Sequence, residues 1–243
     1  MVTYPIQAIG ELQQIAVFDT ETTGIDLEND RILTAFVGLM GRDGALTERW
    51  EWLLDPEMEI PEAAAAVHGV TTERARAEGT DWRTGISEIQ LLIGNLLEAG
   101  IPVVAYNARF DFTVLDRNAR AAGFPSLDAP APVFDPYVTD KAVQKFRKGK
   151  RTLTDTCRVY GVTLDNAHEA EADAVAAGRL MWKLIEGMRP HWTTESMHGT
   201  TRQRAAEQAQ SLQAYFDRTK PTENIVVHAA WPVVPVVEEA VAA

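Results

Sequence analysis

The sequence predicts an α/β fold in which helices pack on the faces of a mixed β-sheet. Three strand-like apolar runs follow one another near the N-terminus, before any long helical pattern. Helical and strand-like segments then alternate as far as about residue 186, an order typical of a mixed sheet covered by helices. The chain has 243 residues, of which 46% are hydrophobic, so it can bury one core together with an appendage.

The first part of the chain is predicted to be a three-stranded antiparallel meander. Its strands are expected at residues 15–18, 31–40 and 46–54. Each contains an apolar run or a partial alternation of apolar and polar residues. A Gly-Arg-Asp-Gly turn signal at residues 41–44 separates the last two strands, and Asp55-Pro56 ends the third.

The remainder of the chain is predicted to alternate between helices and two further strands. Short helical pieces are expected within residues 60–80, and longer helices at 86–97, 109–122, 155–160, 169–186 and 200–217. The strands between them are expected at residues 102–105 and 133–134. The composition changes near residue 190, so we expect one domain at 1–189 and a C-terminal helix with an irregular tail at 190–243.

Composition excludes several classes of protein. The single Cys157 rules out an internal disulfide framework and fits a reducing, cytoplasmic environment. The N-terminus lacks the layout of a signal peptide, and no run of about 18 apolar residues would span a membrane. The formal charge of −12 argues against a general nucleic-acid coat. That charge still allows an enzyme that meets phosphates through metal ions and a local basic patch.

Two carboxylates follow the first predicted strand. Asp19 and Glu21 are two residues apart, so on an extended backbone they point the same way. Their mutual repulsion and loss of hydration require a positive partner, and Mg²⁺ or Mn²⁺ suits carboxylate oxygens. Gly24 then lets the chain turn. The alternative is an acidic strand end that faces solvent.

Further acids follow later in the sequence. Asp111 lies in the first turn of a predicted helix, where a carboxylate is favoured with or without another role. Glu169 and Asp173 share a face of the helix predicted at 169–186. Spacing alone does not say which of the two is a ligand. His168 can join Asp173 in one site only from a loop that precedes this helix.

Three stretches occur in order along the chain: Asp19-Thr20-Glu21-Thr22-Thr23-Gly24, Asn107-x-x-Phe110-Asp111 and His168-x-Ala170-x-x-Asp173. Together they resemble the three motifs of the DnaQ-like (DEDDh) 3′→5′ exonuclease family, which includes the proofreading epsilon subunit of bacterial DNA polymerase III. The resemblance covers about residues 12–187. It implies an RNase H-like mixed sheet of five strands, in the order 3-2-1-4-5 with strand 2 antiparallel, flanked by helices. Tyr106 departs from the family, which usually has His before the Asn.

The resemblance also implies a catalytic site. It selects Asp173 over Glu169 and makes Asp19, Glu21, Asp111 and Asp173 the ligands of two divalent cations, Mg²⁺ or Mn²⁺. Such a pair of ions can activate water and stabilise both oxygens of a phosphodiester under attack. His168 would then be the general base that takes the proton of the attacking water.

Contacts to the substrate are predicted at six further residues. They are Thr22, Thr23, His68, Asn107, Lys145 and Lys148. His68 and Asn107 resemble residues at the family's substrate pocket, although a His-Gly turn and an Asn helix cap explain them as well. The two lysines belong to residues 141–151, which contain six basic residues and no acid. This stretch is either a clamp for the nucleic-acid strand or a solvated loop.

The resulting function is hydrolysis of single-stranded or frayed 3′ ends of DNA to nucleoside monophosphates, in proofreading or repair. The alternatives are an RNase T-like or oligoribonuclease-like enzyme that trims RNA 3′ ends, and a non-catalytic polymerase accessory protein. Residues 210–216 faintly resemble a sliding-clamp-binding peptide. A polymerase or a sliding clamp is therefore the expected protein partner.

Overall fold

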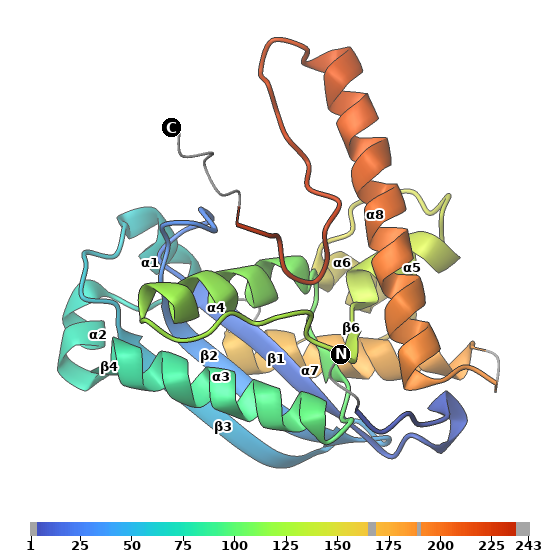
Figure 1. Cartoon of the computed structure of the whole chain (residues 1–243), viewed down its shortest axis with the longest axis horizontal. Coiled ribbons are helices and arrows are strands. Elements are labelled where there is room, and N and C mark those ends of the chain that lie inside the picture. Colours follow the sequence, from blue (N-terminus) through green and yellow to red (C-terminus); the bar gives the residue numbers. More distant parts are fainter. Residues whose placement is uncertain (1–3, 165–168, 189–190, 237–243) are drawn as a thin grey trace, which may run out of the picture.

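The protein is described by a computed structural model that covers residues 4–164, 169–188 and 191–236. Within these residues a six-stranded sheet forms the centre of the molecule (Figure 1). The strands are β1 (Gln14–Thr22), β2 (Ile32–Gly41), β3 (Leu46–Asp55), β4 (Thr80–Asp81), β5 (Val103–Val104) and β6 (Val133–Phe134). They lie in the order β4-β3-β2-β1-β5-β6.

The predicted sheet is confirmed in order and direction. β2 is antiparallel to β1 and β3, whereas β1, β5 and β6 are parallel to one another. The predicted number of five strands is wrong, because the short β4 pairs in parallel with the end of β3. Gly79 allows this approach, since a Cβ there would lie 2.5 Å from the backbone nitrogen of Asp55. β4 was not predicted because it consists of two exposed polar residues, so no apolar run marks it as a strand.

Helices cover both faces of the sheet. They are α1 (Glu62–His68), α2 (Thr72–Glu78), α3 (Trp82–Glu98), α4 (Arg109–Ala121), α5 (Pro136–Val143), α6 (Leu153–Tyr160), α7 (Ala170–Glu186) and α8 (Thr194–Thr219), with a turn of 3-10 helix, η1 (Ile9–Glu11). The sequence analysis missed α5, which begins with Asp135 as its cap. It also placed the start of α8 too late, because a capping box between Thr193 and Ser196 begins the helix at Thr194.

Side chains of β1 alternate between two cores. Ala16 and Phe18 belong to the core beneath α3 and α4, whereas Ile15 and Val17 belong to the core beneath α7. Figure 1 shows α7 behind the sheet and α3 and α4 in front of it. Gly178 brings α7 close, because a Cβ there would lie 2.3 Å from Cγ1 of Val17. By the same alternation, the odd-numbered residues at the end of β1 face α7.

The C-terminal part of the chain packs against α4. Trp231 is 5% exposed and lies in the core beneath α3 and α4. The backbone nitrogen of Val234 donates to Oγ1 of Thr113 at 3.0 Å, and Nη2 of Arg117 donates to the carbonyl of Val234 at 2.9 Å. The described residues after α8 form neither helix nor strand, and they return from the far end of α8 toward α4 (Figure 1). The boundary at residues 189 and 190 stays a prediction.

Among the described residues, no helix combines the length and the apolar character that a membrane span requires.

Candidate active site

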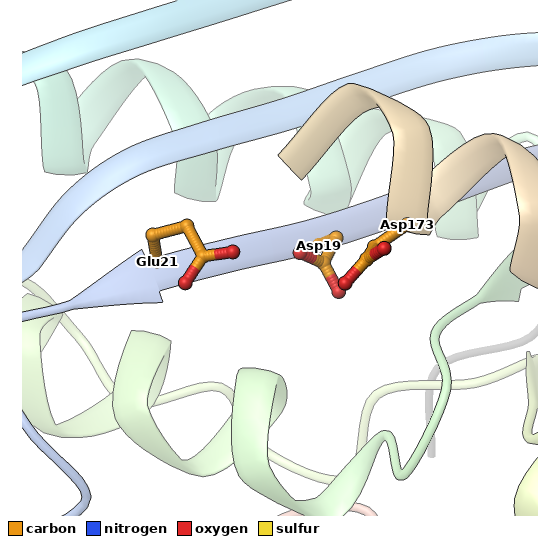
Figure 2. A group of neighbouring side chains, drawn as sticks. All are labelled: Asp19, Glu21 and Asp173. Atoms are coloured by element: carbon orange, nitrogen blue, oxygen red, sulfur yellow. The ribbon is translucent and has the colours of Figure 1, made fainter. Parts of the chain in front are cut away.

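Three carboxylates meet where the end of β1 passes beneath the first turn of α7. Asp19 and Glu21 come from the strand and Asp173 from the helix (Figure 2). Each can offer one carboxylate oxygen, and these oxygens lie within 4.8 Å of one another. This grouping agrees with the choice of Asp173 that the family resemblance implied.

Small residues and a strand irregularity produce this geometry. Ala174 and Ala177 are buried against the sheet, so α7 approaches β1 closely. The register between β1 and β2 shifts between Glu21 and Thr22. Such a bulge bends the strand and redirects a side chain at its end.

The electrostatics of the group favour a bound cation. Burial raises the pKa of Asp19 well above its ordinary value, and the charges of Asp111, Asp173 and Glu21 raise it further. The pKa of Glu21 rises to about 7, through burial and the charges of Asp173 and Asp111. Among the described residues, no ion pair involves Asp19 or Glu21. Clustered hard oxygen donors of this kind fit a divalent ion such as Mg²⁺ or Mn²⁺.

Asp111 reaches this region from the opposite face of the sheet. It lies in the first turn of α4 and is 3% exposed. Its Oδ1 accepts hydrogen bonds from the backbone nitrogen of Thr20 at 3.1 Å and from the Thr20 hydroxyl at 2.9 Å. Burial raises the pKa of Asp111 to about 7, although these hydrogen bonds oppose the shift. The predicted fourth ligand is therefore fixed beside the three-carboxylate group, at hydrogen-bonding distance from β1.

Asp135 is a positioning residue that the sequence analysis missed. It is fully buried, and its carboxylate accepts from the backbone nitrogens of Asn107 and Ala108, each at 3.0 Å. It also caps α5 through Tyr137, at 2.9 Å, and accepts from Nε1 of Trp231 at 3.4 Å. The Asp-Pro pair at the start of α5 was the available signal. Asp135 holds the turn from which α4, and hence Asp111, begins.

Burial raises the pKa of Asp135 to about 6, against the hydrogen bonds that it accepts. The turn that it supports is unusual, because Asn107 has a φ of 63°. A non-glycine residue in this left-handed region needs local support, and the Asp135 carboxylate supplies it.

An open cleft of about 700 Å³ lies beside the acidic group that Asp19, Glu21 and Asp173 form. Its lining includes Glu21, Phe36, His68, Val70 and Ala170. Nδ1 of His68 accepts a hydrogen bond from the backbone nitrogen of Val70 at 3.1 Å. Burial lowers the pKa of His68, and the backbone of Thr22 opposes that shift. His68, predicted at the rim of the substrate pocket, thus shares a cleft with a candidate metal ligand.

The two predicted threonines have structural partners. The Thr22 hydroxyl donates to the carbonyl of Gly24 at 2.5 Å, and the Thr23 hydroxyl donates to Oδ1 of Asp30 at 2.7 Å. The Thr23 oxygen also accepts from the backbone nitrogen of Arg31 at 3.0 Å. These hydroxyls fix the turn that follows β1.

The other predicted residues are either exposed on the surface or outside the described residues. Asn107 is exposed, as are Lys145 and Lys148 in the segment after α5. His168 lies outside the described residues, so its role stays a prediction. Tyr106, at the position where the family usually has His, shares a hydrogen bond of 2.8 Å with Oγ1 of Thr156 and therefore anchors α6.

Comparison with known proteins places this arrangement among nucleases. A family model described as exonuclease matches residues 16–181. The DNA polymerase III PolC-type of Halalkalibacterium halodurans is 25% identical over 173 residues, which are 71% of this chain and 11% of that protein. The corresponding protein of Staphylococcus haemolyticus is 24% identical over 212 residues, or 87% of this chain and 14% of that one. The chain thus spans only a small part of these relatives.

Solved structures share the fold. The zinc-bound complex of Escherichia coli exonuclease I with single-stranded DNA superposes with a TM-score of 0.64 at 20% identity, covering 83% of this chain and 45% of that one. Exonuclease X in complex with 5′-overhanging duplex DNA gives a TM-score of 0.57 at 19% identity, covering 77% and 99%. The exonuclease family match at residues 16–181 includes most of β1, the whole of α4 and the part of α7 that carries Asp173.

Proposed function

The chain belongs to the exonuclease family, and from that premise we propose that it is a metal-dependent 3′→5′ exonuclease that releases nucleoside monophosphates from DNA. The observation that carries the proposal is the meeting of Asp19, Glu21 and Asp173 within 4.8 Å. A folded chain keeps such mutually repelling carboxylates together only at a cost, and sites of this kind are typically functional.

The proposed mechanism assigns a task to each acidic residue. Asp19, Glu21 and Asp173 would hold two divalent cations, with Asp111 acting from its fixed place beside β1. When bound, the cations supply a water of lowered pKa and neutralise charge on the phosphodiester. The raised pKa values of Asp19 and Glu21 mean that these side chains lose their protons as the cations bind.

The remaining residues would orient the strand and move the proton. We assign to His168, which precedes α7, the removal of a proton from the attacking water. His68 would contact the terminal nucleotide from the cleft that it shares with Glu21. Thr22 and Thr23 hold the turn beside that cleft, and Asn107 with Lys145 and Lys148 would contact the strand further from the scissile bond.

A polymerase partner and a proofreading role are part of the same proposal. They rest on the similarity to part of the PolC-type polymerases. A proofreading enzyme should remove a mismatched 3′ nucleotide of a primer–template faster than a matched one. Equal rates of removal for mismatched and matched 3′ nucleotides would favour a repair or trimming role.

The direct test is digestion of 5′-labelled oligonucleotides in Mg²⁺, Mn²⁺ or EDTA, using single- and double-stranded DNA and matched RNA. The expected result is a ladder that shortens one nucleotide at a time from the 3′ end, and that requires a divalent ion. Immediate release of the labelled 5′ nucleotide, or cleavage in EDTA, would contradict the proposal. Preference for the RNA strands would instead favour the trimming enzyme.

A matched control separates the acidic group from general acidity. Asp173→Asn should abolish the ladder, whereas Glu186→Gln should not, because Glu186 is an exposed residue at the other end of the same helix, paired with Lys183. Equal activity of the two variants would contradict the assignment of Asp173 to the proposed catalytic site.

A further inference from the structure

A groove of about 580 Å³ lies between α8 and the segment that follows α5. α5 contributes Lys141, the segment after it contributes Lys145 and Arg151, and α8 contributes Arg204, Leu212 and Tyr215 among others. Figure 1 shows α8 standing beside α5 at the edge of the molecule. α8 lies outside residues 16–181, which the exonuclease model matches, so this groove is formed in part by sequence that the family does not account for.

The groove is basic in a chain whose formal charge is −12. Four cationic residues line it, against the single acid Glu207. Glu207 pairs with Arg204 at 2.7 Å, and Arg151 pairs with buried Asp140. Among the described residues, Lys141 and Lys145 form no ion pair. Nζ of Lys141 donates to the neutral hydroxyl of Tyr137 at 3.3 Å, so the positive charges of both lysines can still attract an anionic ligand.

Exposed apolar side chains accompany these charges. The side chains of Tyr215 and Leu212 on α8 are 49% and 42% exposed. Phe146 is 89% exposed, with Nζ of Lys145 at 5.8 Å from the centre of its ring. Aromatic rings interleaved with lysines are the surface that single-stranded nucleic acid needs, since bases stack on the rings while phosphates meet the charges.

A smaller cavity joins this groove to the motif that carries Asp111. The cavity has a volume of about 140 Å³ and is lined by Asn107 and Arg109. It shares Lys141, Gln208 and Leu212 with the groove. Nε of Arg109 is buried and has no hydrogen-bond partner among the described residues. The cavity, whose lining also includes Asp135, thus holds the unpartnered Nε of Arg109, two residues before Asp111 in the chain, and adjoins the groove between α5 and α8.

We propose that this groove and the adjoining cavity bind the single strand whose 3′ end occupies the acidic site, with α8 as one wall of the path. Arg109, Lys141 and Lys145 contact successive phosphates, and Tyr215 stacks on a base. This inference rests on the proposed function for the location of the 3′ end. The ligand is a phosphodiester strand, and either deoxyribose or ribose satisfies the contacts that the groove offers.

The test measures binding of fluorescent oligonucleotides to the full chain in EDTA, so that cleavage is not needed. Lys141→Gln combined with Lys145→Gln should raise the Kd for a strand of about 16 nucleotides by about tenfold or more. It should also reduce the slope of log K against log salt by about 1.4, since each lost phosphate contact removes roughly 0.7. Tyr215→Ala should weaken binding about fivefold or more through the lost stack. The control outside the groove is Lys183→Gln, which changes an exposed residue of α7 that is paired with Glu186.

Strand length and composition sharpen the result. The loss of affinity should grow from a dinucleotide to the long strand, and DNA and RNA arms show which sugar the path prefers. A photoreactive base placed upstream of the 3′ end should cross-link to α8 near Tyr215. This test uses the unmodified protein, so it does not depend on whether a variant folds. Cross-links confined to other elements would overturn the proposal.

Two further outcomes have distinct meanings. A double lysine variant with the affinity and salt slope of Lys183→Gln would overturn the groove while the nuclease proposal stood. Displacement of the oligonucleotide by polyglutamate at equal charge would make the groove an acidic-peptide site and would also overturn the proposal. Strand binding through the groove without any cleavage in Mg²⁺ would support the groove and contradict the proposed nuclease.

Discussion

Two sets of carboxylates in this protein are arranged in opposite ways. Asp140 is fully buried and has its charge met within the chain, by Arg147 at 2.8 Å, by Arg151, and by the Tyr160 hydroxyl at 3.0 Å. Asp19 and Glu21, by contrast, have other carboxylates as their charged neighbours. Hydration is reduced at both sets, more completely at Asp140 than at the partly buried Asp19 and Glu21, so the two sets differ in exposure as well as in their charged partners.

The difference separates structural from functional charge. A buried carboxylate with two guanidiniums holds elements together, and here Asp140 ties the basic segment after α5 to the body of the protein. Carboxylates that repel one another destabilise the fold until a cation binds between them. Asp116, fully buried between Arg117 and Arg120 at 2.8 Å each, repeats the structural arrangement. The comparison therefore supports the proposed site at Asp19 and Glu21 and identifies Asp140 and Asp116 as parts of the scaffold.

The largest expected effect is on catalysis. Asp19→Asn keeps the shape of the side chain but removes the charge that the cations need. We expect kcat on a labelled oligonucleotide in Mg²⁺ to fall by about 10²–10³-fold or more, the scale for loss of one strong electrostatic contact to a transition state. The Asp116→Asn variant should lose activity only to the extent that it unfolds, so that its folded fraction keeps the normal kcat. Near-normal turnover by folded Asp19→Asn would break the comparison.

The next effect is on stability and falls on the other set. Asp140→Asn leaves Arg147 and Arg151 without their common partner, so the free energy of unfolding should fall by about 3 kcal/mol. Urea unfolding monitored by circular dichroism measures it. Asp155→Asn is the matched control, because its pair with Arg158 is exposed and should contribute less than about 1 kcal/mol. Equal losses in the two variants would show that Asp140 is not a structural anchor.

Most of the fold followed from local patterns in the sequence. The meander and the long helices α3, α4 and α7 have clear periodicities, so they were predicted to within a few residues. The strand order came from the family resemblance, which the match to the exonuclease family confirms. β4 was missed because its two residues are polar and exposed, and α5 because its apolar residues follow a weaker helical period than those of α6, which is equally long. Residues such as Trp231 also gave no sign that the tail would return to cover α4.

The acidic group was predictable only in part. Alternation along β1 was enough to bring Asp19 and Glu21 to one face. Asp173 needed the motif, because Glu169 has equivalent spacing on the helix. The role of Asp135 depends on contacts with Asn107 and Ala108, which are nearly thirty residues away in the chain, and no local pattern reports such contacts. The substrate residues and the domain boundary stay predictions.

A smaller effect is expected in the pH dependence of stability. Glu21 has its pKa raised from 4.5 to about 7, so its contribution to stability is complete below pH 4.5 and is lost as pH rises through 7. In EDTA the free energy of unfolding should decline by about 1–2 kcal/mol between about pH 5 and 7.5, less than the full linkage because Glu21 is partly exposed. Saturating Mg²⁺ should reduce this decline, because bound cations favour the charged carboxylates.

His198 should change the free energy of unfolding with pH in the opposite direction in the same experiment. Burial lowers its pKa to about 4, so its contribution is complete above about pH 6.5 and is lost as pH falls toward 4. This pH dependence belongs to the contacts of α8 with Val133 and Trp231 and should not respond to Mg²⁺. The difference between the Mg²⁺ and EDTA curves therefore isolates the acidic group. Parallel curves would mean that no divalent cation binds there.

The smallest expected effect reverses the usual consequence of a buried substitution. In EDTA, Asp19→Asn removes one of several mutually repelling charges, so the melting temperature at pH 7.5 should rise. A gain of about 1 kcal/mol corresponds to about 2–4 °C for a chain of this size. Asp140→Asn should move the melting temperature the other way under the same conditions, and Mg²⁺ should stabilise the unmodified protein more than Asp19→Asn. A fall in the melting temperature of Asp19→Asn in EDTA would mean that Asp19 is already compensated within the fold, and the contrast between the two sets of carboxylates would fail at its centre.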